Sequence, residues 1–260
     1  MSRNIRNLVI CLSVVIVGTG VCACDPDKQP SKPDPAFSNV WSAEPGIDLF
    51  SRGTELVRAA HESGWLVNRA GIDNAYIGYR EALAPPDNDH DMDVLFTEQK
   101  TFQGADSVLQ AGKETDYSRV TALSANGKTV TATVCRYVVP EKGVNSGNLN
   151  DFASTMSVVD LRLENTGSEP GKTGVADNDP GQHDPAAHRV PSWNVFGTWK
   201  ITKIKRNLDA DPEGCRSWFQ QQIPGLIAEP GSKTLKFPPT LQIPPQPVAV
   251  QYPEWISPSQ

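Results

Sequence analysis

Residues 117–139, YSRVTALSANGKTVTATVCRYVV, decide the class of the fold. In the second half of this stretch, small apolar residues alternate with threonine, which is typical of a strand whose two faces differ. One face carries Val130, Ala132, Val134 and Val138, and the other carries Thr129, Thr131, Thr133, Cys135 and Tyr137. Asn126-Gly127 is the pair that best fits a two-residue type I′ turn. The stretch therefore predicts an antiparallel β-hairpin of residues 117–125 and 128–139.

Two helices are predicted before the hairpin. Residues 47–60 place apolar side chains on one helical face, with Arg52, Glu55 and Arg58 elsewhere. A second helix is expected to begin near Asp73 and to end before Pro85-Pro86, because proline stops a helix.

The remaining segments complete the fold class. Residues 87–93 are an acidic loop, and residues 94–112 are compatible with a helix or with a short helix and a turn. Residues 154–164 and 194–206 predict two more long strands. Helices followed by strands predict an α+β domain, in which N-terminal helices pack on a curved antiparallel sheet of about four strands.

The N-terminus has the composition of an export signal. Arg3 and Arg6 precede an apolar stretch without acidic residues. The sequence Val-Cys-Ala-Cys at residues 21–24 then resembles the lipobox of bacterial lipoproteins. This resemblance implies that Cys24 carries the lipid and that the chain is held by its acyl chains on the outer face of the cell membrane. An ordinary secreted protein and an uncleaved helical anchor are the alternatives.

Composition excludes other classes of protein. Lys and Arg number 24 against 30 Asp and Glu, a net charge of −6, so no basic field attracts a nucleic acid. The apolar run at residues 8–21 has 14 residues, fewer than the roughly 20 that a spanning helix needs, which excludes a polytopic membrane protein.

The five cysteines divide into three sets. Cys11 and Cys22 would leave with the signal, and Cys24 would carry the lipid. Cys135 and Cys215 then remain as a pair, which an oxidising compartment usually joins in a disulfide. The alternative is a pair of reactive thiols, each followed by an arginine.

Four regions follow from these observations. Residues 1–23 are the signal peptide, and residues 24–40 are a proline-rich tether. Residues 41–222 form the α+β domain, with an irregular loop at 165–192 that is rich in Gly, Asp and Pro. Residues 223–260 form a proline-rich tail, whose composition favours an extended polyproline conformation over packing. This tail is expected to be a spacer that lies along the domain or to be disordered, and docking of a partner that binds proline-rich segments is the alternative.

The order of these features resembles actinobacterial, mycobacterial-type lipoproteins with a nuclear transport factor 2-like domain. The resemblance rests on AYIGYREAL at 75–83, on the strand 128–137 with Cys135, and on FGTWKITK at 196–203 with Cys215. It implies a cone-shaped sheet that closes over helices to leave an apolar ligand pocket, for which Tyr76, Tyr79 and Trp199 are candidate lining residues. The long loop and the tail depart from the family's pattern.

Three functions follow from this interpretation. The first is a non-catalytic module that binds an apolar small molecule or a neighbouring envelope protein, without a cofactor. The second is a structural or antigenic surface protein. The third is a small isomerase or cyclase-like enzyme, in which Tyr76, Tyr79 and Asp160 would supply a buried acid-base pair.

The loop DNDPGQHDPAAH at 177–188 carries possible metal ligands but matches no metal motif, so no metal site is predicted.

Overall fold

The computed structural model describes residues 37–85, 90–97, 113–145, 156–179, 187–207, 213–228 and 235–258. These residues belong to one unit of the chain, Pro35–Gln260. The predicted signal peptide, Cys24 and most of the predicted tether lie outside the described residues.

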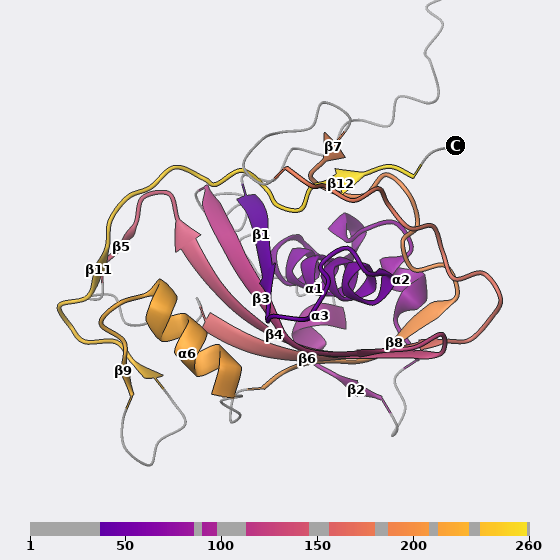
Figure 1. The fold of residues 1–260 in the computed structure, drawn as a ribbon, viewed down its shortest axis with the longest axis horizontal. Helices are drawn as coiled ribbons and strands as arrows, with labels where there is room; N and C mark the ends of the chain where they lie inside the picture. The colour runs from indigo at the N-terminus through magenta and orange to yellow at the C-terminus, as the bar shows by residue number, and fades with distance from the viewer. Residues whose placement is uncertain are drawn as a thin grey trace, which may run out of the picture. The chain divides into compact units, whose positions relative to one another are not determined.

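A six-stranded, mostly antiparallel sheet forms the centre of an α+β fold (Figure 1). Its order is β1-β3-β4-β6-β8-β2. The four central strands run antiparallel to one another and are β3 (Glu114–Ala125), β4 (Thr129–Pro140), β6 (Met156–Asn165) and β8 (Trp199–Arg206). They confirm the predicted α+β class and the four predicted strands.

Two edge strands extend the sheet beyond the prediction. β1 (Phe37–Ala43) runs parallel to β3 and begins inside the range expected for the tether. β2 (Asp91–Met92) runs parallel to β8 and lies in the segment expected as an acidic loop. Both are edge strands, where pairing with a neighbour rather than intrinsic propensity decides the conformation.

The turn of the hairpin differs from the predicted type. A type I′ turn requires positive φ at both central residues, yet neither Asn126 nor Gly127 has a positive φ. Instead, the side-chain oxygen of Asn126 accepts hydrogen bonds from the backbone N–H groups of Lys128 and Thr129, both at 2.8 Å. The asparagine side chain closes the turn, as in an Asx-turn.

The first helix starts later and runs further than its pattern predicts. α1 (Arg52–Ala70) begins after Ser51, whose hydroxyl accepts the N–H of Thr54, and ends at Gly71. The predicted second helix is two short pieces, η1 (Ile72–Asn74) and α2 (Tyr79–Ala82). Gly78, with a φ of +85°, breaks the helical path between them. α3 (Val94–Thr97) occupies the start of the ambiguous segment.

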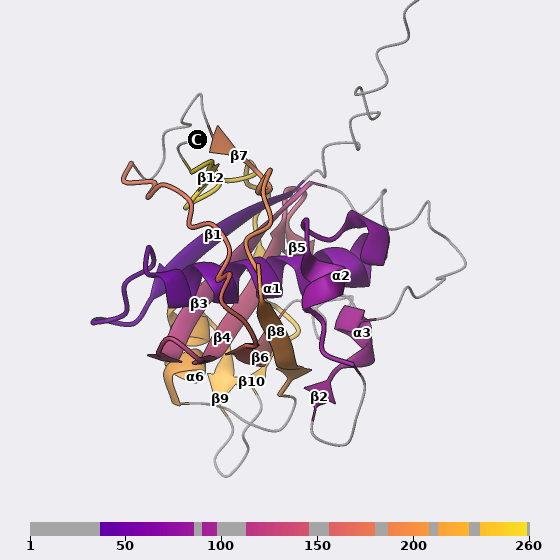
Figure 2. The ribbon, with the colours of Figure 1, turned by 90° about the vertical axis from the view of Figure 1, so that its right-hand side faces the viewer.

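The sheet separates two hydrophobic cores. It curves around α1 on its inner face, while α6 (Glu213–Gln222) lies on its outer face (Figures 1 and 2). Val130, Ala132 and Val134 belong to the inner core, and Cys135 and Tyr137 belong to the outer core. These positions confirm the two unequal faces predicted for β4.

The tail packs on the domain, which corrects the expectation that its prolines would disfavour packing. Three small two-stranded sheets hold it and its neighbours: β5 (Val144–Asn145) with β11 (Gln242–Ile243), β7 (Ala187–His188) with β12 (Trp255–Ile256), and β9 (Ile227–Ala228) with β10 (Leu235–Lys236). Trp255 is only 2% exposed and belongs to the inner core. Its buried area offsets the entropy lost when the tail is ordered.

Candidate functional site

An outer pocket of about 350 Å³ lies beside the end of α6. The sheet contributes Tyr117, Tyr137 and Val139, the last residue of α6 and the two that follow it contribute Gln222, Ile223 and Pro224, and the tail contributes Leu241, Gln242, Ile243, Pro244 and Gln246. Three segments therefore meet at one concave site, the sheet being far in sequence from the other two, and the tail forms one of its walls.

Aromatic rings form the sheet side of the outer pocket. Tyr117 and Tyr137 stack with ring centroids 4.8 Å apart and planes 12° from parallel. Trp218 packs against Tyr137 at 5.0 Å. Burial raises the pKa of both tyrosines, so both phenols are neutral at physiological pH.

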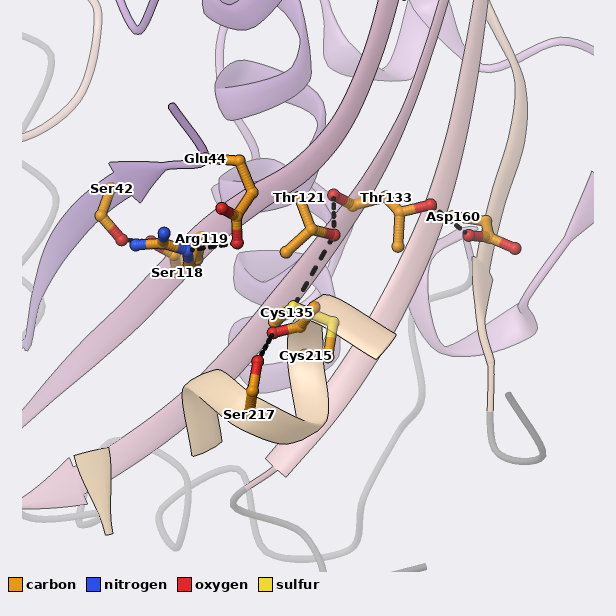
Figure 3. The surroundings of a disulfide bond; sticks show 11 residues. Ser42, Glu44, Ser118, Arg119, Thr121, Thr133, Cys135, Asp160, Cys215 and Ser217 are labelled. Carbon is orange, nitrogen blue, oxygen red and sulfur yellow. Dashed lines mark hydrogen bonds and ion pairs between the residues drawn. A yellow bond between two sulfur atoms is a disulfide. The ribbon is translucent and has the colours of Figure 1, made fainter. Parts of the chain in front are cut away.

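A disulfide fixes α6 to the outer face of the sheet (Figure 3). Its two cysteines belong to the same hydrophobic cluster as Tyr137, Val139 and Ile223 of the pocket lining. Cys135 on β4 and Cys215 on α6 are joined across 80 residues, with 5.4 Å between their Cα atoms. Both cysteines are fully buried. The predicted disulfide is confirmed, and the alternative of two reactive thiols is wrong. Arg136, the arginine that follows Cys135, binds Asp116 instead.

A polar cluster lies inside the domain, centred on Glu62 of α1. Trp41 and Trp255 donate their indole N–H groups to its carboxylate at 2.7 and 3.0 Å, and the Tyr76 hydroxyl donates as well. The Arg58 guanidinium lies 3.8 Å from the same carboxylate and 4.4 Å from the centre of the Trp255 ring. Burial raises the pKa of Glu62 although these partners favour its charged form.

The polar face of α1 is covered by chain, not by water. Residues 53–67 are all buried, so the charged side chains that lie away from the apolar face are buried as well. Side chains on this face bind backbone groups of the loop and the tail: Arg52 donates to the Val195 carbonyl, Glu55 accepts from the Gly174 N–H, and Arg58 donates to the Pro253 carbonyl. Figure 2 shows the chain between β6 and β8 crossing α1. The irregular segments thus gain the hydrogen-bond partners that buried backbone requires.

A second polar cluster surrounds Asp116 of β3. Arg69 and Arg136 donate to its carboxylate at 3.0 and 2.8 Å. Burial alone would raise the pKa of Asp116, but the two guanidinium groups outweigh it and hold this pKa below its ordinary value. Nearby, burial and the charge of Arg136 lower the pKa of His61 to about 3. His61 is therefore neutral, and its Nε2 accepts the indole N–H of Trp65 at 3.2 Å.

The residues predicted to line an inner pocket are packed in the inner core. Tyr76 is 5% exposed and hydrogen-bonds Glu62. Tyr79 is fully buried and donates to the carbonyl of Phe96 at 3.0 Å. Trp199 is 3% exposed, and its indole N–H has no hydrogen-bond partner among the described residues. All three belong to one hydrophobic cluster, whereas the outer pocket lies on the opposite face of the sheet.

Asp160 does not join the two tyrosines that would form an acid-base pair with it. It is paired with Thr133 across β4 and β6, on the face that carries the disulfide (Figure 3). Its carboxylate accepts from the Thr133 hydroxyl at 3.0 Å and lies 3.2 Å from Lys203 Nζ. The sheet separates this carboxylate from Tyr76 and Tyr79.

The possible metal ligands of the 177–188 loop are used by the fold where they are described. Asp177 is buried and accepts the backbone N–H groups of Asp179 and Glu254. His188 lies in β7, opposite Trp255. His183 and Asp184 lie outside the described residues. Among the described residues, no three His, Cys, Asp or Glu side chains are grouped as metal ligands would be.

The sequence-based prediction missed both interior clusters and the outer pocket. A signal for one of them was present, since Arg136 lies between Val134 and Val138 on the apolar face of β4 and must therefore be buried. Glu62 follows Arg58 by one helical turn, which allows an ion pair. No local pattern indicates that Trp255, 193 residues away from Glu62, would complete the cluster.

Comparison with known proteins gives no family for this chain. A scan against family models and searches of curated proteins and of solved structures found no match. In the part of the chain that the structure describes, no helix is long and apolar enough to cross a membrane. The function is therefore inferred from the chain's own residues and geometry.

Proposed function

We propose that this protein is a lipid-anchored extracytoplasmic module that binds a ligand in its outer pocket and performs no catalysis. The anchor is supported by the basic head, the apolar stretch and the lipobox-like residues 21–24. The disulfide is consistent with this address, because such bonds persist in oxidising compartments.

The proposal includes a nuclear transport factor 2-like fold for the domain. The curved, mostly antiparallel sheet around α1 supports it. In this chain the space expected for an inner pocket holds the Glu62 cluster, with Trp255 of the tail inserted into it. Ligand binding is consequently assigned to the outer face of the sheet.

The outer pocket is the observation that carries the binding function. Its volume of about 350 Å³ is within the range of small-molecule sites, and aromatic and aliphatic side chains line it together with a few amides. This size and this mixed lining favour binding of a small molecule over a purely structural or antigenic role.

The absence of catalysis is proposed from the chemistry of the lining. The described residues around the outer pocket carry no carboxylate, imidazole, ammonium or thiol, the groups that most acid-base and nucleophilic mechanisms require. The ionisable groups of the interior clusters are engaged in buried contacts with one another.

Substitution of the lipid site tests the anchor. We expect Cys24→Ala to abolish acylation and to leave the protein uncleaved or released from the membrane, whereas Cys22→Ala should leave both unchanged. Membrane fractionation and intact-mass measurement report the acyl chains. An acylated mass in the Cys24→Ala protein would refute the lipobox interpretation.

Retention of a ligand tests the binding function. Native mass spectrometry of the full chain, extracted in mild detergent from its own membrane, should show an added mass that denaturation removes. Gln242→Trp would fill the outer pocket and should eliminate that mass, while Gln221→Trp, at an exposed position outside the lining, should keep it. An added mass that survives Gln242→Trp would place the ligand elsewhere and contradict the proposal.

A further inference from the structure

We infer that the outer pocket takes a neutral, hydroxyl-bearing ring, such as a sugar residue of a glycan. The inference rests on the proposed function, because it names the ligand class for the same pocket. It differs from the apolar ligand that the sequence predicts for an inner pocket.

An aromatic platform supplies the first part of the argument. Tyr137 is only 4% exposed, because it lies between Tyr117 and Trp218. Tyr117 is half-buried, so it is the ring of this stack that keeps accessible surface toward the pocket. The negative face of an aromatic ring attracts the weakly positive C–H edges of a ligand, and a sugar ring presents such C–H groups on one side.

Glutamine side chains give the pocket groups that can hydrogen-bond the hydroxyls of a ligand. Gln222, Gln242 and Gln246 line the pocket and are exposed. The Tyr137 hydroxyl donates to the side-chain oxygen of Gln222 at 3.1 Å, which holds this amide and leaves its N–H groups available for a ligand. In the described residues, the side chains of Gln242 and Gln246 make no hydrogen bond. Amides both donate and accept, as hydroxyl groups do, so the two are complementary.

The charge of the lining excludes other ligands. Its described residues carry no charged side chain, and both tyrosines remain neutral because burial raises the pKa of each. A charged ligand would lose hydration without gaining a counter-charge. A purely apolar ligand would cover the three amides without satisfying them, which also costs free energy.

The walls of the pocket are held in place before a ligand binds. The disulfide fixes α6, and β5 pairs with β11 of the tail. Gly143 has a φ of +73°, and a Cβ there would lie 2.3 Å from the Ile243 carbonyl oxygen, so glycine permits this close approach. Pre-organised walls reduce the entropy lost on binding.

Binding of defined oligosaccharides tests the inference. We would titrate the full chain in detergent with neutral gluco-, manno-, galacto- and arabino-oligosaccharides and with uronic acid oligomers of equal length. At least one neutral series should bind. Tyr117→Ala should weaken it by about tenfold and Tyr117→Phe by less than about threefold, because phenylalanine keeps the ring.

Exposed amides give a test that does not disturb the aromatic stack. The double substitution Gln242→Ala, Gln246→Ala should weaken binding by about tenfold or more, and Gln221→Ala should leave it unchanged. Binding of neutral sugars that withstands the double substitution would overturn the inference, as would preference for the uronic acid oligomers.

The neutral apolar dye Nile red separates the inference from the proposed function. If the dye binds, Gln242→Trp displaces it, and no sugar binds, the outer pocket is a binding site but the ligand class is wrong. If neither the sugars nor the dye bind in a manner sensitive to Gln242→Trp, both the inference and the proposed function are wrong.

Discussion

At the scale of single residues, the interior is organised by buried charges that find their partners across long sequence distances. Glu62 accepts from two tryptophans and a tyrosine, and Asp116 accepts from two arginines. A buried charge without partners is costly, so each cluster fixes the relative positions of the segments that contribute to it. Through Trp41, Glu62 and Trp255, β1, α1 and the tail are joined at one carboxylate.

Replacing Glu62 tests its role as an acceptor. Glu62→Gln places an amide N–H₂ where a carboxylate oxygen accepts now, so one donor loses its partner and Arg58 loses its counter-charge. We expect a loss of about 3 kcal/mol or more in the free energy of unfolding, measured by urea denaturation.

Glu164 provides the matched control for this substitution. Its ion pair with Arg162 is largely exposed, with side-chain exposures of 40% and 51%. Glu164→Gln should therefore change stability by less than about 1 kcal/mol. Equal losses in the two variants would contradict the account of the interior cluster.

His61 predicts a stability that falls in acid. Its pKa is about 3 in the folded protein and 6.5 ordinarily, so below pH 6.5 the unfolded chain binds a proton that the folded protein excludes. Between pH 7 and pH 4 this proton uptake by the unfolded chain should lower the free energy of unfolding by about 3 kcal/mol. The pKa of Glu62 is raised in the folded protein, so protonation of Glu62 adds stability as the pH falls. A variant at His61 is therefore needed to separate the two effects.

The comparison is between the unmodified chain and His61→Gln, whose amide oxygen can still accept from Trp65. Urea denaturation across this pH range should show a smaller loss of stability in the variant. Identical losses would show that His61 is not the neutral, buried imidazole described above.

At the scale of elements, the sequence predicts the features that depend on residues close together in the chain. The hairpin, the four long strands and the disulfide follow from alternation, turn residues and the cysteine count. β1, β2 and the breaks around Gly78 do not, because they depend on pairing with distant strands and on local backbone geometry. The largest difference between prediction and structure lies in the tail. Its prolines indicate an extended chain, but they do not indicate that Trp255 lies in the inner core and donates to Glu62.

Trp255 tests whether the tail is part of the domain. Trp255→Ala should lower the free energy of unfolding by about 3 to 5 kcal/mol, because it leaves a cavity in the inner core and removes a donor to Glu62. Val250→Ala, at a position in the same segment that is 45% exposed, should change it by less than about 0.5 kcal/mol. A tail that merely lies on the surface would show two equally small effects.

At the scale of the whole molecule, two features separate this chain from a cone with an open inner pocket. The loop between β6 and β8 and the C-terminal tail cover α1, and the concave site instead lies between α6 and the tail. The sequence predicts the class of fold but not this site, because its walls come from three segments whose proximity depends on the folded chain.

A ¹⁵N-resolved NMR titration of the labelled chain with a detergent extract of its own cell envelope distinguishes binding in the outer pocket from binding on the inner face of the sheet. The side-chain amide signals of Gln222, Gln242 and Gln246 report the outer pocket, and the indole N–H signals of Trp41 and Trp255 report the inner cluster. We expect the glutamine signals to shift, the two indole signals to stay in place, and Gln242→Trp to suppress the shifts. Movement of the indole signals with unchanged glutamine signals would place the ligand on the inner face and contradict binding in the outer pocket.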